Sequence, residues 1–329
     1  MRIFSCQGLL VLAAFAAHTL HAAEAPAPAA GSQPAASDGS IQVSGSDLLQ
    51  AAVGEPLARY AQLNGLKAKV DLYGTVPALV LLKGNKAQLG LIAIPPGQKP
   101  PEGYTTVEYC FQVAYILVNP ENPLNAVDRT QLVGIFGTGT EKEIATWGDA
   151  GLSGLWFGRT VIPISTSADD GVVLELFKNT VLGQATIKPG VRVLKTATDV
   201  AKAVAGSNTV IALSGYVPET DAKALLVSME ARLSSAVPAA ATGGTGAYAP
   251  TEDNVYSGAY PLRLPFYLAF KPENKERLRE VLRVLLSNEF AQHLRDQHLM
   301  PVPETERKKS LLGLDIPADT GTISPPAAP

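Results

Sequence analysis

The sequence predicts an α/β protein made of two units, with largely parallel sheets. Short apolar runs alternate with longer segments whose apolar residues recur at helical spacing, and short turns separate them. Residues 161–182, VIPISTSADDGVVLELFKNTVL, show this order as a buried strand, a hydroxyl-rich turn and a helix. Such alternation is typical of α/β folds. A mature chain of about 300 residues is also long enough for two domains.

The two ends of the chain carry segments that are not expected to join the fold. Residues 1–23 have a charged start at Arg2, an apolar core and an alanine-rich end, the pattern of a secretory signal peptide rather than a transmembrane span. Residues 24–40 and 316–329 are rich in Pro, Ala, Ser and Gly, which predicts a disordered leader and a disordered tail. We therefore expect a periplasmic protein that does not span the membrane after processing.

The first unit, lobe 1, is expected to contain residues 41–118 and 215–315. It opens with a strand that ends at the turn Gly45-Ser46-Asp47, and a later turn, Gly74-Thr75, begins another helix. Asn64-Gly65 ends the first helix with a left-handed cap. The strands of this unit are predicted at 41–44, 70–73, 89–94, 225–229 and 264–270, and two helices follow them.

The second unit, lobe 2, is expected to be residues 119–214, inserted into the first. Its predicted strands are 161–164, 191–194 and 209–214, and its helices include 130–136 and 197–205. Two crossings between the lobes, near Asn119 and Ser214, would form a two-strand hinge. Proteins of this design close on a ligand by hinge motion.

Composition and residue spacing exclude several kinds of chemistry. The net charge is −3, and loss of Arg2 makes it −4, so no binding to nucleic acid or anionic lipid is expected. Cys110 remains alone after processing, which excludes an internal disulfide, and its apolar flanks predict a buried, inert thiol. His293 and His298 have the wrong spacing for metal ligation from one helix face. We therefore expect no enzyme, no metal and no cofactor.

Several motifs occur in the same order over residues 41–300 as in one known family. They include VSGSDLL, LGLIAIPP, YILVNPENPL, TVIALSGY, SGAYPLRLPFY and LSNEFAQHLRDQHLMPVP. In this respect the chain resembles the phosphate-type, PstS-like substrate-binding proteins of bacterial ABC importers, which have the two-lobed type II periplasmic binding-protein fold. The resemblance implies a monomer that captures a small polar solute, phosphate or a similar oxyanion, in its interlobe cleft and passes it to an ABC permease.

The resemblance also implies where the ligand is bound. Relatives donate hydroxyl and N–H groups from the first strand-to-helix turn and from a Ser or Thr in the second. In the interlobe turn, hydroxyls would act together with the N-terminus of a helix, which attracts anions. The seven candidate contacts in this chain are Gly45, Ser46, Asp47, Thr75, Ser165, Thr166 and Ser167.

The chain departs from the family at two charged positions. Relatives end the third strand in an Asp that accepts a proton from phosphate, and here Ile92 or Ala93 stands in that place. Relatives carry an Arg in the interlobe turn, where this chain has Thr166 followed by Asp169 and Asp170. Two carboxylates in a first helical turn repel an anion, so they could instead receive a ligand with a donor or a positive charge.

Each candidate also has a structural explanation. Ser46, Asp47 and Thr75 are suited to capping helices without any ligand, and Asp169 and Asp170 would stabilise a helix N-terminus. If all of them only cap, the protein could be a degenerate member of the fold that acts as an envelope interaction or scaffold protein.

Other polar and aromatic positions are weaker candidates. Residues 137–140, GTGT, lack the Lys-Ser/Thr ending of a phosphate loop and predict a surface turn. Tyr260 is the tyrosine that we expect at the cleft.

Overall fold

A computed structural model describes residues 39–140, 142–167, 172–218, 221–230 and 246–316. The signal peptide, nearly all of the leader, Asp169, Asp170 and nearly all of the tail lie outside these residues. The folded chain begins with a strand at Ile41, as predicted from the sequence.

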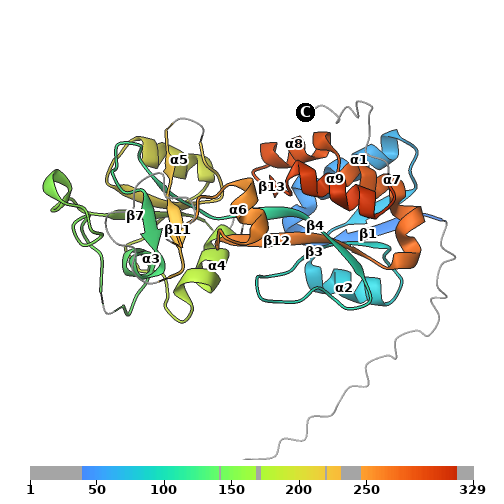
Figure 1. Cartoon of the computed structure of the whole chain (residues 1–329), viewed down its shortest axis with the longest axis horizontal. Coiled ribbons are helices and arrows are strands. Elements are labelled where there is room, and N and C mark those ends of the chain that lie inside the picture. Colours follow the sequence, from blue (N-terminus) through green and yellow to red (C-terminus); the bar gives the residue numbers. More distant parts are fainter. Residues whose placement is uncertain (1–38, 141, 168–171, 219–220, 231–245, 317–329) are drawn as a thin grey trace, which may run out of the picture. The chain divides into compact units, whose positions relative to one another are not determined.

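The first sheet has six strands in the order β13-β4-β12-β3-β1-β2 (Figure 1). Strand β1 pairs in parallel with β2 and β3, as expected from the alternation of strands and helices in the sequence. Strand β12 runs antiparallel to both β3 and β4. The bounds are β1 Ile41–Gly45, β2 Ala68–Asp71, β3 Leu89–Ala93, β4 Thr105–Val113, β12 Arg263–Phe270 and β13 Met300–Pro301.

The second sheet has five strands in the order β10-β5-β9-β7-β8, and β6 pairs with β11 in a separate two-stranded sheet. Strand β7 is parallel to β8 and β9, whereas β5 is antiparallel to β9. The bounds are β5 Tyr115–Val118, β6 Ala126–Asp128, β7 Ile162–Thr166, β8 Arg192–Leu194, β9 Val210–Ser214, β10 Lys223–Ala224 and β11 Leu226–Ser228.

Helices cover both faces of the first sheet (Figure 1). On one face, Ala78 and Leu82 of α2 pack with Ile92 of β3. On the other face, α1 and α7 bury Leu57 and Leu278 in the main core. The described helices are α1 Glu55–Leu63, α2 Thr75–Lys83, α3 Arg129–Phe136, α4 Val173–Phe177, α5 Ala197–Ala205, α6 Glu252–Ser257, α7 Lys275–Leu285, α8 Asn288–Asp296 and α9 Glu304–Gly313.

Short turns of other helical types extend the ends of strands and helices. Two of them, η1 and η2, link β1 to α1, and one of them, η5, continues α4. Their bounds are η1 Asp47–Leu49, η2 Gln50–Gly54, η3 Gly154–Trp156, η5 Lys178–Leu182 and η6 Pro272–Asn274.

The chain crosses between the two sheets at different places from those expected. Strand β4 ends at Val113 and β5 begins at Tyr115, so the first crossing is at Ala114 rather than near Asn119. The expected return near Ser214 is wrong, because β10 pairs with β5 and β11 pairs with β6. The strand expected at 225–229 therefore belongs with the second sheet, and the chain returns between β11 and β12. Strands as short as β10, with two residues, leave no periodic pattern in the sequence.

Across the described ranges, no helix combines the length and the apolar character that crossing a bilayer requires.

Candidate ligand-binding site

The turns that follow β1 and β2 are joined at the carboxyl edge of the first sheet. The Ser46 N–H donates a hydrogen bond to the Leu91 carbonyl oxygen, at 2.7 Å, and the Gly74 N–H donates to the Gly45 carbonyl oxygen, also at 2.7 Å. A Cβ on Gly45 would lie 2.4 Å from the Leu91 carbonyl oxygen. Gly45 is therefore explained by the close approach of β1 to β3, with no need for a ligand.

The Thr75 side chain links the turn after β2 to the end of β3. Its hydroxyl oxygen accepts a hydrogen bond from the N–H of Ala93, at 3.0 Å, at the end of β3. Thr75 is the first residue of α2, and the N-cap position belongs to Gly74. The capping explanation of Thr75 is therefore wrong, since its hydroxyl holds two turns together.

Among the described residues, the Ser46 hydroxyl has no hydrogen-bond partner. Ser46 occupies the N-cap position of η1, but its side chain makes no capping hydrogen bond. The residue is 2% exposed. Asp47, the next residue, is exposed in the first turn of η1. Capping therefore does not account for Ser46, which remains a candidate donor.

The corresponding edge of the second sheet uses its hydroxyl groups differently. Ser165 is fully buried, and its hydroxyl donates to the Thr166 carbonyl oxygen, at 3.0 Å. We expected Ser165 to donate to a ligand, but its hydroxyl proton is already hydrogen-bonded to the backbone of β7. Thr166 is 1% exposed at the end of β7, and the Ser167 N–H donates to the Leu194 carbonyl oxygen, at 2.7 Å. Thr166 and Ser167 remain the candidates at this edge.

No acidic side chain ends the third strand, in agreement with the sequence. Ile92 is fully buried against α2, and Ile94 is 6% exposed. In the described residues, no Lys or Arg takes part in the hydrogen bonds that join the turns at the two edges. The site therefore offers an anion hydroxyl and N–H donors, without a cationic side chain in those contacts.

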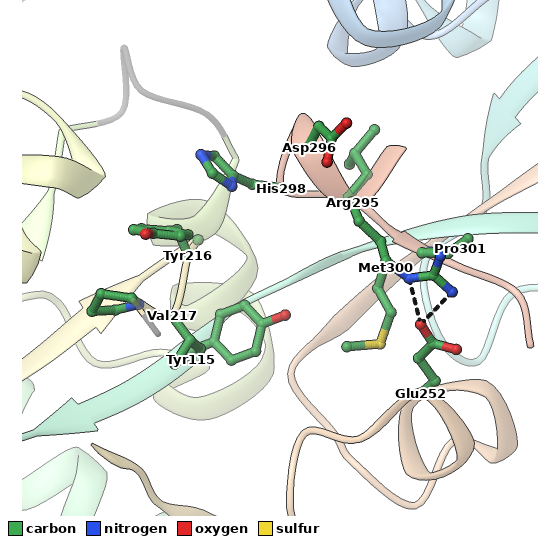
Figure 2. A pocket seen from close by; sticks show the side chains of 12 residues that line it. Tyr115, Tyr216, Val217, Glu252, Arg295, Asp296, His298, Met300 and Pro301 are labelled. Carbon is green, nitrogen blue, oxygen red and sulfur yellow. Dashed lines mark hydrogen bonds and ion pairs between the residues drawn. The ribbon is translucent and has the colours of Figure 1, made fainter. Parts of the chain in front are cut away.

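A cavity of about 680 Å³ is lined by other residues, and none of the seven candidates is among them (Figure 2). Tyr115 and Tyr216 line it from the second sheet and its loops, and Arg295 and His298 line it from α8 and the turn that follows. Arg295 forms an ion pair with Glu252, at 2.9 Å. The rings of Tyr216 and His298 lie 4.3 Å apart.

Burial, together with the charge of Glu252, raises the pKa of Tyr115 to about 12, so this hydroxyl is protonated at neutral pH. The residues that line the cavity come from distant segments, and no sequence motif connects them. Sequence reasoning therefore missed this cavity.

Two other expectations concern buried side chains. Tyr260 is fully buried and its hydroxyl donates to the Ala114 carbonyl oxygen, at 2.8 Å, so the expected role at the cleft is wrong. Cys110 is fully buried, and burial raises the pKa of its thiol well above the ordinary value, in agreement with an inert thiol.

Within the described ranges, no cluster of His, Cys, Asp and Glu could hold a metal ion.

Comparison with known proteins places the chain in a family. Residues 29–289 match the model of the PBP superfamily domain. The phosphate-binding protein PstS of Pseudomonas aeruginosa is 25% identical over 228 residues, which cover 67% of this chain and 66% of that protein. The chain thus matches about two thirds of the length of this curated relative.

Solved structures show the same fold. An ABC-type phosphate transport receptor from Vibrio cholerae superposes with a TM-score of 0.54 at 18% identity, over 79% of this chain and 99% of that one. PstS from Borrelia burgdorferi superposes with a TM-score of 0.58 at 14% identity, over 80% and 98%. The family match covers most of the chain, and the α/β fold agrees with it. The protein therefore belongs to the PBP superfamily and has the two-lobed fold of periplasmic binding proteins.

Proposed function

We propose that this protein is a monomeric, periplasmic solute-binding protein that captures a small oxyanion, phosphate or a similar anion, for an ABC importer. The observation that carries this proposal is the edge of the first sheet. There the Ser46 hydroxyl has no partner among the described residues, and its turn is hydrogen-bonded to Gly74 at the start of α2. The signal-peptide pattern of residues 1–23 supports export.

The N-terminus of α2 supplies the electrostatic part of the site. Ala78 is the first residue of this helix whose N–H reaches a carbonyl four residues back, that of Gly74, and Pro77 has no N–H. The N–H groups of Thr75 and Val76 therefore have no partner within the helix. Such groups, with the helix dipole behind them, attract an anion.

The edge of the second sheet would complete the site from the other lobe. Thr166 and Ser167 stand at the carboxyl end of β7, as Ser46 stands at the carboxyl end of β1. Ligands of open α/β sheets bind outside the carboxyl ends of the strands. Closure of the two lobes would bring both sets of donors to one anion.

The relatives support the same ligand class. The curated relative is a phosphate-binding protein, and the Vibrio cholerae structure is described as a phosphate transport receptor. Binding in this family needs no covalent chemistry, which agrees with a function other than catalysis.

Calorimetric titration of the ligand-stripped protein with inorganic phosphate at low salt tests the proposal. We expect a dissociation constant in the micromolar range or below. Thr166→Val removes one donor at nearly constant volume and should weaken binding about tenfold. The matched control is Thr130→Val, on an exposed position of α3, which should bind phosphate as the parent does.

Absence of both binding heat and a thermal shift would contradict the proposal. That result would favour a cationic or neutral solute, or an envelope interaction protein that has kept the fold without a transport ligand.

A further inference from the structure

Large, exposed apolar side chains lie next in sequence to the polar groups at the edge of the first sheet. Leu48 is 41% exposed, Tyr73 is 75% exposed and Val76 is 73% exposed. Single exposed apolar residues are ordinary, but a group of them beside a polar site marks a binding surface. We call these three residues the apolar rim.

The apolar rim lies on the same turns as the candidate donors. Leu48 is two residues after Ser46, while Tyr73 and Val76 flank Gly74 and Thr75. The Gly74 N–H donates to the Gly45 carbonyl oxygen, at 2.7 Å, which joins these turns.

A second hydrogen bond joins the same two turns, between the residue after η1 and the end of β2. The Leu72 N–H donates to the side-chain oxygen of Gln50, at 3.2 Å, and Gln50 directly follows η1. The turns that carry the rim and the turns that carry the donors are therefore held together.

Helix α2 has an unusual distribution of side chains for an exposed helix. Its buried residues are Ala78 and Leu82, yet Val76 and Val80 on another face are also apolar, and both are more than 60% exposed. Its first charged residue is Lys83, at the last position. A helix that is apolar on its solvent side needs a partner on that side.

We infer that the preferred ligand is an organic oxyanion, such as a phosphate monoester, whose apolar substituent covers the rim while its charged end binds at Ser46 and the start of α2. This inference rests on the proposed function and specifies its ligand. Covering Tyr73 and Val76 removes apolar surface from water, and a ring on the ligand can stack on Tyr73. Inorganic phosphate has no group that could make these contacts.

The test compares phenyl phosphate with inorganic phosphate in calorimetric titrations of the full protein. Phenyl phosphate should bind at least about tenfold more tightly, the effect expected from covering one or two apolar side chains. Tyr73→Ser, which removes the exposed ring, should reduce that preference severalfold and leave the affinity for inorganic phosphate unchanged. The matched control is Phe157→Ser, which removes an exposed ring that is not part of the rim, and which should keep the full preference.

Each other outcome contradicts the inference in a recognisable way. Equal affinities for the two ligands, unchanged by Tyr73→Ser, would overturn the inference and leave phosphate binding intact. An equal loss for both ligands in Tyr73→Ser would mean that the rim packs against the other lobe on closure. A dimer on gel filtration that Tyr73→Ser dissociates would assign the rim to a second copy. Failure of both ligands to bind would overturn the proposed function itself. Because the substituted positions are exposed, thermal melting should show that all variants are folded.

Discussion

We call the turns at the carboxyl ends of β1, β2 and β3 the first edge, and the turn at the carboxyl end of β7 the second edge. At the first edge, the Ser46 hydroxyl has no partner among the described residues. At the second edge, the Ser165 hydroxyl donates to the Thr166 carbonyl oxygen. Both turns are rich in hydroxyl groups in the sequence, and both follow a parallel strand. Within the described part of the chain, the hydroxyl at the first edge is left without a partner, while one hydroxyl at the second edge is bound to the backbone. Similar sequence patterns thus have different consequences at the two edges.

The difference indicates which lobe supplies most of the binding energy. At the first edge, three hydrogen bonds fix the turns after β1, β2 and β3 relative to one another. A fixed set of donors loses little entropy when a ligand binds, which favours affinity. We therefore expect the first edge to bind the anion and the second edge to complete the site on closure.

The largest effect is expected where the first edge is most tightly packed. Gly45→Ala would place a Cβ 2.4 Å from the Leu91 carbonyl oxygen, so β1 and β3 must separate. We expect a loss of about 3 kcal/mol in the free energy of unfolding, measured by chemical denaturation. Gly190→Ala is the control, because a Cβ there meets nothing within 4 Å, and its stability should stay near that of the parent. Equal stability of the two variants would show that the edge is not closely packed.

A paired substitution compares the two edges directly. Ser46→Ala should weaken phosphate binding about tenfold and leave stability unchanged, since its hydroxyl has no partner within the described residues. Ser165→Ala should do the opposite, with unchanged affinity and a loss of about 1 kcal/mol in the free energy of unfolding. Calorimetry gives the phosphate affinity and denaturation gives the stability of both variants. A loss of affinity in Ser165→Ala alone would show that the second edge, rather than the first, binds the anion.

Cys110, which is buried in β4 of the first sheet, should make the folded protein less stable at alkaline pH. Burial raises the pKa of Cys110 in β4 well above its ordinary value, so the thiol stays protonated in the folded state and ionises in the unfolded state. The unfolded state then binds fewer protons, and stability falls as the pH rises above the ordinary thiol pKa. From pH 9 to 10 the loss from this group should be about 1 kcal/mol. Cys110→Ala should lose less stability over the same range in denaturation experiments, and an identical loss would assign the effect to other groups.

The smallest effect concerns the charge at the first edge. Asp47 is exposed beside Ser46, so its carboxylate repels an anion only weakly and through solvent. Asp47→Asn should strengthen phosphate binding about twofold to threefold at low salt, and the gain should disappear near physiological ionic strength. A gain that persists in salt would mean that Asp47 directly contacts the anion.

The sequence predicted the first edge well because its signals are local. Glycine, hydroxyl residues and a following helical pattern mark the turns at Gly45 and Gly74, and the parallel strands bring those turns together. The apolar character of Ile92 at the end of the third strand was also readable directly.

Other features could not be read from the sequence because they depend on distant contacts. Residues 109–118 are apolar except for Gln112, and nothing in this run marks Ala114 as the place where the chain leaves the first sheet. The partner of the Ser165 hydroxyl is set by backbone geometry, and the burial of Tyr260 depends on a carbonyl 146 residues away. Periodicity reports which face is buried and gives no information on which groups pair.

The most direct test is to follow the backbone amide resonances of the ¹⁵N-labelled protein while inorganic phosphate is added. We predict the largest shifts at Ser46 and Thr75 on the first edge, with smaller shifts at Ser167 on the second. Shifts confined to Tyr216 and His298 would place the anion in the cavity of Figure 2 and contradict binding at the strand ends.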